Sequence, residues 1–163
     1  MGASYNFDAP RRGALLLATS VSGNVRGAGD PEGADVLRIP RSDMEKGRLR
    51  RRTEGGRDVG ISVEPGTLRD GDVLGCDPPV VVRQEPERVV RVRSDDPVLM
   101  AVAGHAIGNW HRPISTGGGA VTFPARSDSD ADAIRGLLGG TGAEVSVEEA
   151  VFTPRGGSDV HGH

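Results

Sequence analysis

Short apolar segments separated by turn residues fill the first half of the chain. Four of them have the length and apolar content of β-strands: residues 14–21, 48–53, 58–63 and 80–83. Glu54-Gly55-Gly56 lies between the middle two and predicts a hairpin. Pro65-Gly66 and Asp70-Gly71 predict further turns, because proline presets φ and glycine accepts positive φ. We therefore expect a small β-rich domain over residues 1–86.

The pattern changes after Gln84-Glu85-Pro86, which we interpret as a linker. Residues 88–93 alternate in part and predict a strand. Asp96 followed by Pro97 predicts the start of a helix, because an acidic side chain caps free N–H groups and proline favours the first helical position. The helix should cover residues 97–109, since Pro113 prevents its continuation. Four apolar residues fall at helical spacing on one of its faces: Leu99, Val102, Ala106 and Trp110.

A second hairpin and a second helix complete this half. Residues 114–116 and 120–123 flank three glycines and predict the hairpin. A helix should begin at Asp130 and end at Gly139-Gly140, with a buried stripe of Ile134, Leu137 and Leu138. Residues 144–152 predict the last strand. The βαββαβ order is typical of a ferredoxin-like fold.

These elements predict an α+β protein with three parts. The β-rich domain over residues 1–86 is followed by a ferredoxin-like domain over residues 87–152. Residues 153–163 contain little to bury, so we expect a flexible C-terminal tail.

Composition narrows the classes of function. The formal net charge is −3 and the pI is about 5.8, which argues against a nucleic-acid-binding protein because such proteins usually carry a basic domain. No apolar run approaches the length of a membrane-spanning helix. Cys76 is the only cysteine, a usage that excludes an intrachain disulfide and is consistent with a reducing cytoplasm. We expect a cytoplasmic protein with no nucleic-acid or membrane partner.

One basic run stands out against this acidic background, and its members are Arg48, Arg50, Arg51 and Arg52. We interpret the run as the solvated face of a strand. A patch that binds phosphate or an acidic partner is the less favoured alternative.

The four histidines carry the clearest chemistry, and they are His105, His111, His161 and His163. No nucleophile elbow, phosphate-binding loop or HExxH motif accompanies them, so we do not expect an enzyme. Metal binding is the remaining chemistry that these histidines could provide. His105 and His111 lie six residues apart, which on a helix separates them by roughly 120° and about 9 Å, so these two are poorly placed to chelate one ion together.

His111 follows the predicted helix and should project from its end. A single imidazole binds a divalent ion weakly, but a two-fold axis would bring His111 of two subunits to one point. His161 and His163 would add ligands from the tail, unless they are a chance ending. Imidazole suits nickel, zinc and copper, so the residues predict a metal-binding homodimer without choosing its metal.

Residues 107–113, Ile-Gly-Asn-Trp-His-Arg-Pro, resemble the GN-x-H-x-P signature of the UreE family, the nickel metallochaperones of urease maturation. The resemblance extends to residues 48–74 and to residues 142–157 ahead of the histidine-bearing end. It covers roughly residues 41–163, and the first forty residues match only loosely.

The resemblance implies a peptide-binding-like N-terminal β-domain and a ferredoxin-like metal-binding domain through which the chains form homodimers. It implies that His111 binds nickel at the dimer axis, that His161 and His163 contribute ligands, and that Gly108, Asn109 and Pro113 support the motif. Ala106 stands where some family members carry another histidine. We therefore expect one axial site rather than high-capacity storage.

The resemblance also implies a function and partners. The chain would carry Ni(II) as cargo and deliver it during urease active-site maturation, with the urease maturation GTPase complex and apo-urease as partners. Zn(II) or Cu(II) binding is expected in vitro. Two alternatives stay open: a zinc or copper buffer protein, and a metal-independent adaptor whose β-domain binds unfolded segments.

Overall fold

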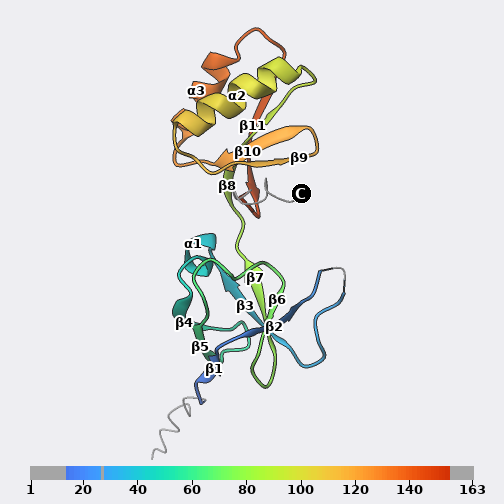
Figure 1. Ribbon diagram of the computed structural model, residues 1–163, viewed down its shortest axis with the longest axis vertical. Helices are drawn as coiled ribbons and strands as arrows, with labels where there is room; N and C mark the ends of the chain where they lie inside the picture. Colours follow the sequence, from blue (N-terminus) through green and yellow to red (C-terminus); the bar gives the residue numbers. More distant parts are fainter. Residues whose placement is uncertain (1–13, 27, 155–163) are drawn as a thin grey trace, which may run out of the picture. The chain divides into compact units, whose positions relative to one another are not determined.

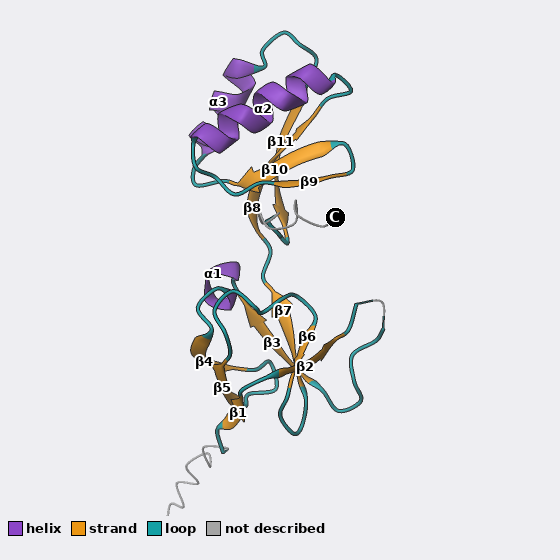
Figure 2. Cartoon of the chain, in the orientation of Figure 1, coloured by secondary structure: helices purple, strands orange, loops and turns teal. Residues whose placement is uncertain are grey.

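The computed structural model describes residues 14–26 and 28–154 (Figures 1 and 2). The chain divides into two compact units, and the boundary falls between Glu85 and Pro86. No helix in the described ranges is long and apolar enough to cross a membrane. Apart from Thr153 and Pro154, the expected tail lies outside the described residues, and so do His161 and His163.

Two small sheets build the first unit, with the strand orders β1-β5-β4 and β2-β6-β7-β3. The elements are β1 (Leu16–Ala18), β2 (Val21–Asn24), β3 (Asp35–Ile39), α1 (Arg41–Met44), β4 (Arg48–Arg52), β5 (Asp58–Ser62), β6 (Asp72–Leu74) and β7 (Val80–Gln84). Alternate side chains of β3 and β5 point into a shared core that contains Leu37, Ile39, Val59 and Ile61. Among the described strands, β4 lies at the edge of its sheet, beside β5.

The predicted hairpin around Glu54-Gly55-Gly56 is confirmed, because β4 and β5 pair antiparallel with Arg50 opposite Gly60. The single strand expected over residues 14–21 is wrong. That segment contains β1 and the start of β2, which belong to different sheets, since the chain leaves one sheet at Thr19-Ser20 and enters the other. β3, α1 and β6 were not predicted, because none exceeds five residues and so none shows a periodic pattern.

The second unit has the expected ferredoxin-like topology. Its elements are β8 (Glu87–Arg93), α2 (Pro97–Asn109), β9 (Ser115–Gly117), β10 (Ala120–Pro124), α3 (Asp128–Leu137) and β11 (Glu144–Ala150). The strands lie in the order β11-β8-β10-β9, and each neighbouring pair is antiparallel. Both helices cover one face of this sheet (Figure 2). The core between the layers contains Val90, Val92, Ala103, Ile107, Phe123, Ala131 and Ile134.

The predicted bounds of α2 are confirmed, and Asp96 caps it by accepting a hydrogen bond of 2.8 Å from the Val98 N–H. The face of α2 that we expected to be buried is only partly right. The fully buried line runs through Ala103 and Ile107, whereas Val102 is 40% exposed. Apolar residues surround this helix on every side, so their spacing does not reveal which side meets the sheet.

The second predicted helix, α3, begins two residues earlier than expected. Ser127 is its N-cap and forms a capping box with Asp130, which places Asp130 in the first turn. Ile134 and Leu138 are buried as expected, but Leu137 is 48% exposed. Ala131 takes the remaining place in the buried stripe, since it lies one turn before Ile134.

Candidate metal-binding histidine

His111 lies immediately after α2 in a left-handed backbone conformation. Its φ is +53°, and it is the only non-glycine residue with positive φ in the described ranges. Its N–H donates to the Gly108 carbonyl at 2.9 Å, and the Arg112 N–H donates to the Ile107 carbonyl at 3.3 Å. These two bonds define a Schellman motif, which most often has glycine at the left-handed position. The helix therefore ends with an exposed imidazole where the backbone favours a residue without a side chain.

The residues expected to support the motif have separate roles around this helix end. Gly108 supplies a carbonyl to the His111 N–H. Pro113 follows two residues later and cannot continue the helix. Asn109 contacts His105 rather than His111, since its Nδ2 lies 3.0 Å from the His105 Nε2. Asn109 thus engages one ring nitrogen of His105, the histidine within α2.

Arg112 ties the segment after α2 to the start of α3. Its guanidinium donates two hydrogen bonds to the Asp130 carboxylate at 2.8 and 2.9 Å, and a third to the Pro124 carbonyl at 3.2 Å. The side chains of Arg112 and Asp130 are 8% and 14% exposed, so the ion pair is largely shielded from water. The residue adjoining His111 is therefore fixed against both β10 and α3.

The Asp130 carboxylate stays charged in this setting. Burial would raise its pKa, but backbone N–H groups of Arg126 and Ser127 and the charge of Arg112 lower the pKa below its usual value. Sequence reasoning missed this pair. Arg112 falls at an unspecified position of the signature, and its partner lies 18 residues away, so no local pattern connects the two.

Of the three predicted ligands, only His111 lies among the described residues, because His161 and His163 fall outside them. His105 and His111 are both exposed, and neither shares a cluster with other donors. No group of three His, Cys, Asp or Glu side chains in the described ranges could hold a metal ion. His111 thus offers one accessible imidazole, and a complete donor set requires a second chain, the tail, or both.

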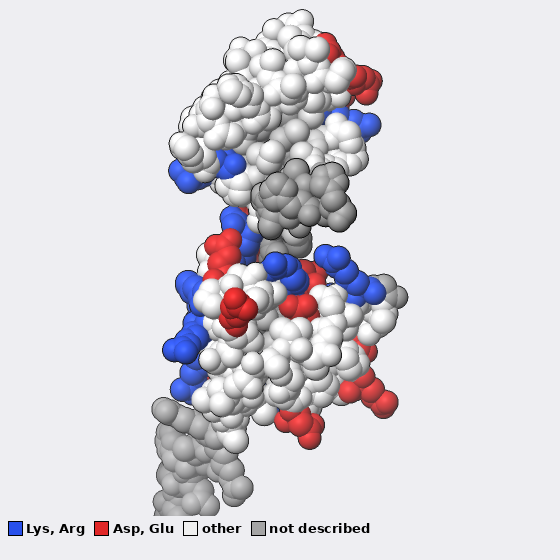
Figure 3. All heavy atoms as spheres, viewed as in Figure 1, with Lys and Arg blue, Asp and Glu red and all other residues white. Residues whose placement is uncertain are grey.

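The exposed side of α2, the helix that precedes His111, carries no charged side chain. α2 contains no charged residue, and it exposes Val98 (67%), Val102 (40%) and the adjoining Trp110 (36%). Trp110 packs edge-on against Phe123 with the ring centroids 6.1 Å apart. The side of this unit seen in Figure 3 is correspondingly dominated by uncharged residues. Such a face favours protein contact over solvent exposure.

The fold and this site define a class: a two-unit α+β protein in which a ferredoxin-like domain presents an exposed histidine at the end of an apolar helix. The models of the UreE urease accessory protein N-terminal and C-terminal domains match residues 18–86 and 87–163. The chain belongs to the UreE urease accessory protein family.

Individual relatives carry the same description, urease accessory protein UreE. The relative from Burkholderia lata is 38% identical over 125 residues, and the match covers 72% of this chain and 58% of that protein. The relative from Alkalilimnicola ehrlichii is 36% identical over 126 residues, covering 76% and 74% of the two chains. The chain therefore spans less than two thirds of the length of the Burkholderia lata protein.

Proposed function

We propose that this protein is a metallochaperone that binds Ni(II) as cargo and delivers it during urease maturation. In this proposal two chains associate through the α2 face, and His111 of each chain meets the other at the two-fold axis. The observation that carries the proposal is the placement of His111. An exposed imidazole occupies the left-handed position of the helix end, directly beside an uncharged helix surface.

The donor set fits exchangeable cargo better than a permanent structural ion. Each chain contributes one described imidazole, so a symmetric pair supplies two, short of the four ligands of a closed structural site. His161 and His163 would supply the remaining nitrogens from the tail. Ligands that leave one at a time allow an ion to pass to an acceptor, because no step requires breaking every bond at once. Protonated imidazole cannot bind a metal, so acid should release the ion.

The family and the names of the relatives support the cellular setting. The relatives are described as urease accessory proteins, which supports a chain that assists assembly and is not itself an enzyme. We infer that its partners are the urease maturation GTPase complex and apo-urease, and that it works in the cytoplasm. Nickel is favoured over zinc or copper by this setting alone, since imidazole accepts all three.

Calorimetry with nickel tests the site. The His111→Ala variant should lose most of its affinity for nickel. The matched His105→Ala variant should keep that affinity, because His105 lies within α2 and engages Asn109. Removal of residues 160–163 should weaken binding or lower stoichiometry without dissociating the dimer. Unchanged affinity in His111→Ala would contradict the axial site, and equal binding by the truncated chain would remove the tail from it.

Activation of apo-urease tests the cargo. Nickel-loaded protein should activate purified apo-urease in the presence of the GTPase complex, and nickel-loaded His111→Ala should not. Zinc-loaded protein should leave apo-urease inactive. If zinc or copper bound far more tightly than nickel and nickel-loaded protein failed to activate, the chain would be a metal buffer.

A further inference from the structure

The outer face of β4 carries three arginines in alternate positions: Arg48, Arg50 and Arg52. Strand alternation directs the two intervening side chains to the opposite face. There Leu49 packs against the core, and Arg51 donates hydrogen bonds of 2.8 and 2.5 Å to the buried Asp43 carboxylate. Figure 3 shows Lys and Arg side chains gathered along the β4 side of this unit. The fold therefore divides the basic run into one structural arginine and an exposed row of three.

The same three residues direct their backbone groups away from the sheet. At the two ends of the β4–β5 pair, the Val63 N–H donates to the Gly47 carbonyl and the Thr53 N–H donates to the Arg57 carbonyl, both at 2.8 Å. Bonded and non-bonded residues alternate in an antiparallel pair, so the odd-numbered residues of β4 bond to β5. The backbone N–H and C=O groups of the arginine row consequently face the free edge, since among the described strands β4 has no neighbour on that side.

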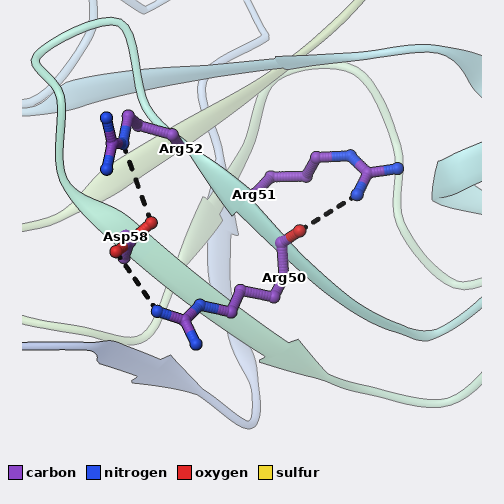
Figure 4. Close-up of a pocket in the computed structure, with 4 residues that line it drawn as sticks. All are labelled: Arg50, Arg51, Arg52 and Asp58. Atoms are coloured by element: carbon purple, nitrogen blue, oxygen red, sulfur yellow. Dashed lines mark hydrogen bonds and ion pairs between the residues drawn. The ribbon is translucent and has the colours of Figure 1, made fainter.

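One of these outward groups is engaged within the chain. The Arg50 carbonyl accepts a hydrogen bond of 3.0 Å from the Arg51 Nη1 (Figure 4). Because this contact comes from an exposed arginine side chain, it can exchange for a backbone donor at little cost. The edge thus offers alternating donors and acceptors at the spacing of a β-strand.

The row keeps positive charge. Arg50 and Arg52 share a single carboxylate, that of Asp58, at 3.2 and 3.8 Å (Figure 4). Their side chains remain 64% and 69% exposed. For Arg48, no acidic side chain in the described ranges forms an ion pair. Three guanidinium groups therefore stand over one carboxylate beside a free strand edge.

We propose that the edge of β4 docks an extended acidic segment of a partner protein by strand addition. An added strand would exchange backbone hydrogen bonds with Arg48, Arg50 and Arg52, and its directly opposed side chains would lie on the arginine face. Asp or Glu at alternate positions of that segment would each meet a guanidinium. The proposal does not depend on the metal site, which lies in the other unit.

The positive charge of the arginine row favours an acidic segment of a partner protein over a second copy of the chain. Two β4 edges paired with one another would place arginine rows in mutual contact, and like charges directly opposed across strands are destabilising. Charged edge residues commonly prevent indiscriminate strand pairing. The row therefore disfavours a basic strand and favours an acidic one. Nucleic acid is disfavoured because the chain as a whole carries a net charge of −3.

Peptide titration of the full chain tests the proposal. The probe is a labelled peptide in which glutamate and threonine alternate, followed by fluorescence anisotropy and by amide spectra of the isotope-labelled protein. The expected result is saturable binding that shifts the Arg48, Arg50 and Arg52 amides. The Arg48→Glu variant should bind at least about tenfold more weakly, because reversal of one charge replaces attraction by repulsion across the strand pair. Arg26→Glu, an exposed arginine outside this face, is the matched control and should bind as the wild type does.

Two modified peptides separate strand addition from simple charge attraction. Lysine in place of glutamate should abolish binding. N-methylation of the glutamates keeps their charge but removes the N–H groups that would donate to β4, so it should also abolish binding. Equal binding of the N-methylated peptide, or unchanged affinity in Arg48→Glu, would overturn the proposal. Tighter, Arg48-dependent binding of a single-stranded oligonucleotide would also overturn it and assign the face to nucleic acid.

Discussion

The guanidinium of Arg112 and the carboxylate of Asp130 form a two-bond ion pair that joins the end of α2 to the first turn of α3. The pair is largely shielded from water, and Arg112 directly follows His111. The position of the candidate ligand therefore depends on an ion pair in which His111 itself takes no part. Removing one partner would leave the other charge buried without compensation.

Asp130→Asn should lower the free energy of unfolding of the second unit by about 3 kcal/mol, because it leaves the Arg112 charge buried and unpaired. Trp110 packs against Phe123 within this unit, so its fluorescence in urea follows the relevant transition. Asp132→Asn is the control. Asp132 pairs with Arg135 on the exposed side of α3, and its loss should cost under about 0.5 kcal/mol. Equal losses of unfolding free energy in the two variants would show that the buried charge of Arg112 does not need the Asp130 carboxylate.

His111→Gly should separate folding from metal binding. Glycine accepts positive φ without steric cost, so the variant should be more stable than wild type by about 0.5–1 kcal/mol while it loses nickel binding. His111→Ala should lose nickel binding without that gain in stability. The measurements are urea unfolding followed by Trp110 fluorescence and nickel calorimetry. A less stable glycine variant would indicate that the imidazole itself supports the fold.

Acid should destabilise the first unit through Asp35. Burial would raise the pKa of this carboxyl, but hydrogen bonds from Thr53, Arg57 and the Gly55 and Val36 backbone outweigh burial and lower the pKa from 3.8 to about 2. A lowered folded-state pKa stabilises the fold above the unfolded value, so about 2 kcal/mol present at pH 5 should be lost between about pH 4 and pH 2. Urea unfolding at several pH values, followed by circular dichroism, measures this loss. Asp35→Asn should flatten the pH dependence in that window, and an unchanged slope would contradict the assignment.

Gly55→Ala should disrupt the same network by steric means. A Cβ at this position would lie 2.5 Å from the Asp35 Oδ2, so the carboxylate would have to move away from its donors. We expect a loss of about 1–3 kcal/mol in the free energy of unfolding. Gly23→Ala is the control in the same unit, because a Cβ there would meet no atom within 4 Å. Similar losses in both variants would indicate a general cost of leaving glycine rather than a clash with Asp35.

Local signals predicted much of this fold. Asp96 and Pro97 marked the start of α2, and the glycines after Glu54 marked the β4–β5 hairpin, because capping and turn formation depend on neighbouring residues. That His105 and His111 do not bind one ion together stays a prediction from their spacing.

Long-range contacts account for what the sequence could not predict. The buried side of α2 is set by packing against the sheet, and a helix with apolar residues on every side carries no pattern that reveals that side. The pairing of Arg112 with Asp130 links two elements through tertiary packing alone. The free edge of β4 likewise depends on sheet order, so the arginine run looked like an ordinary solvated strand until its backbone direction was known.

Native mass spectrometry with nickel tests the central claim most directly, because it reports subunit number and metal number in the same ion. For the wild-type protein we predict a dimer of 17.0 kDa chains that carries one nickel ion. For His111→Ala we predict the same dimer without the nickel ion. A nickel-bearing monomer, or a His111→Ala dimer that retains its nickel, would contradict the shared axial site.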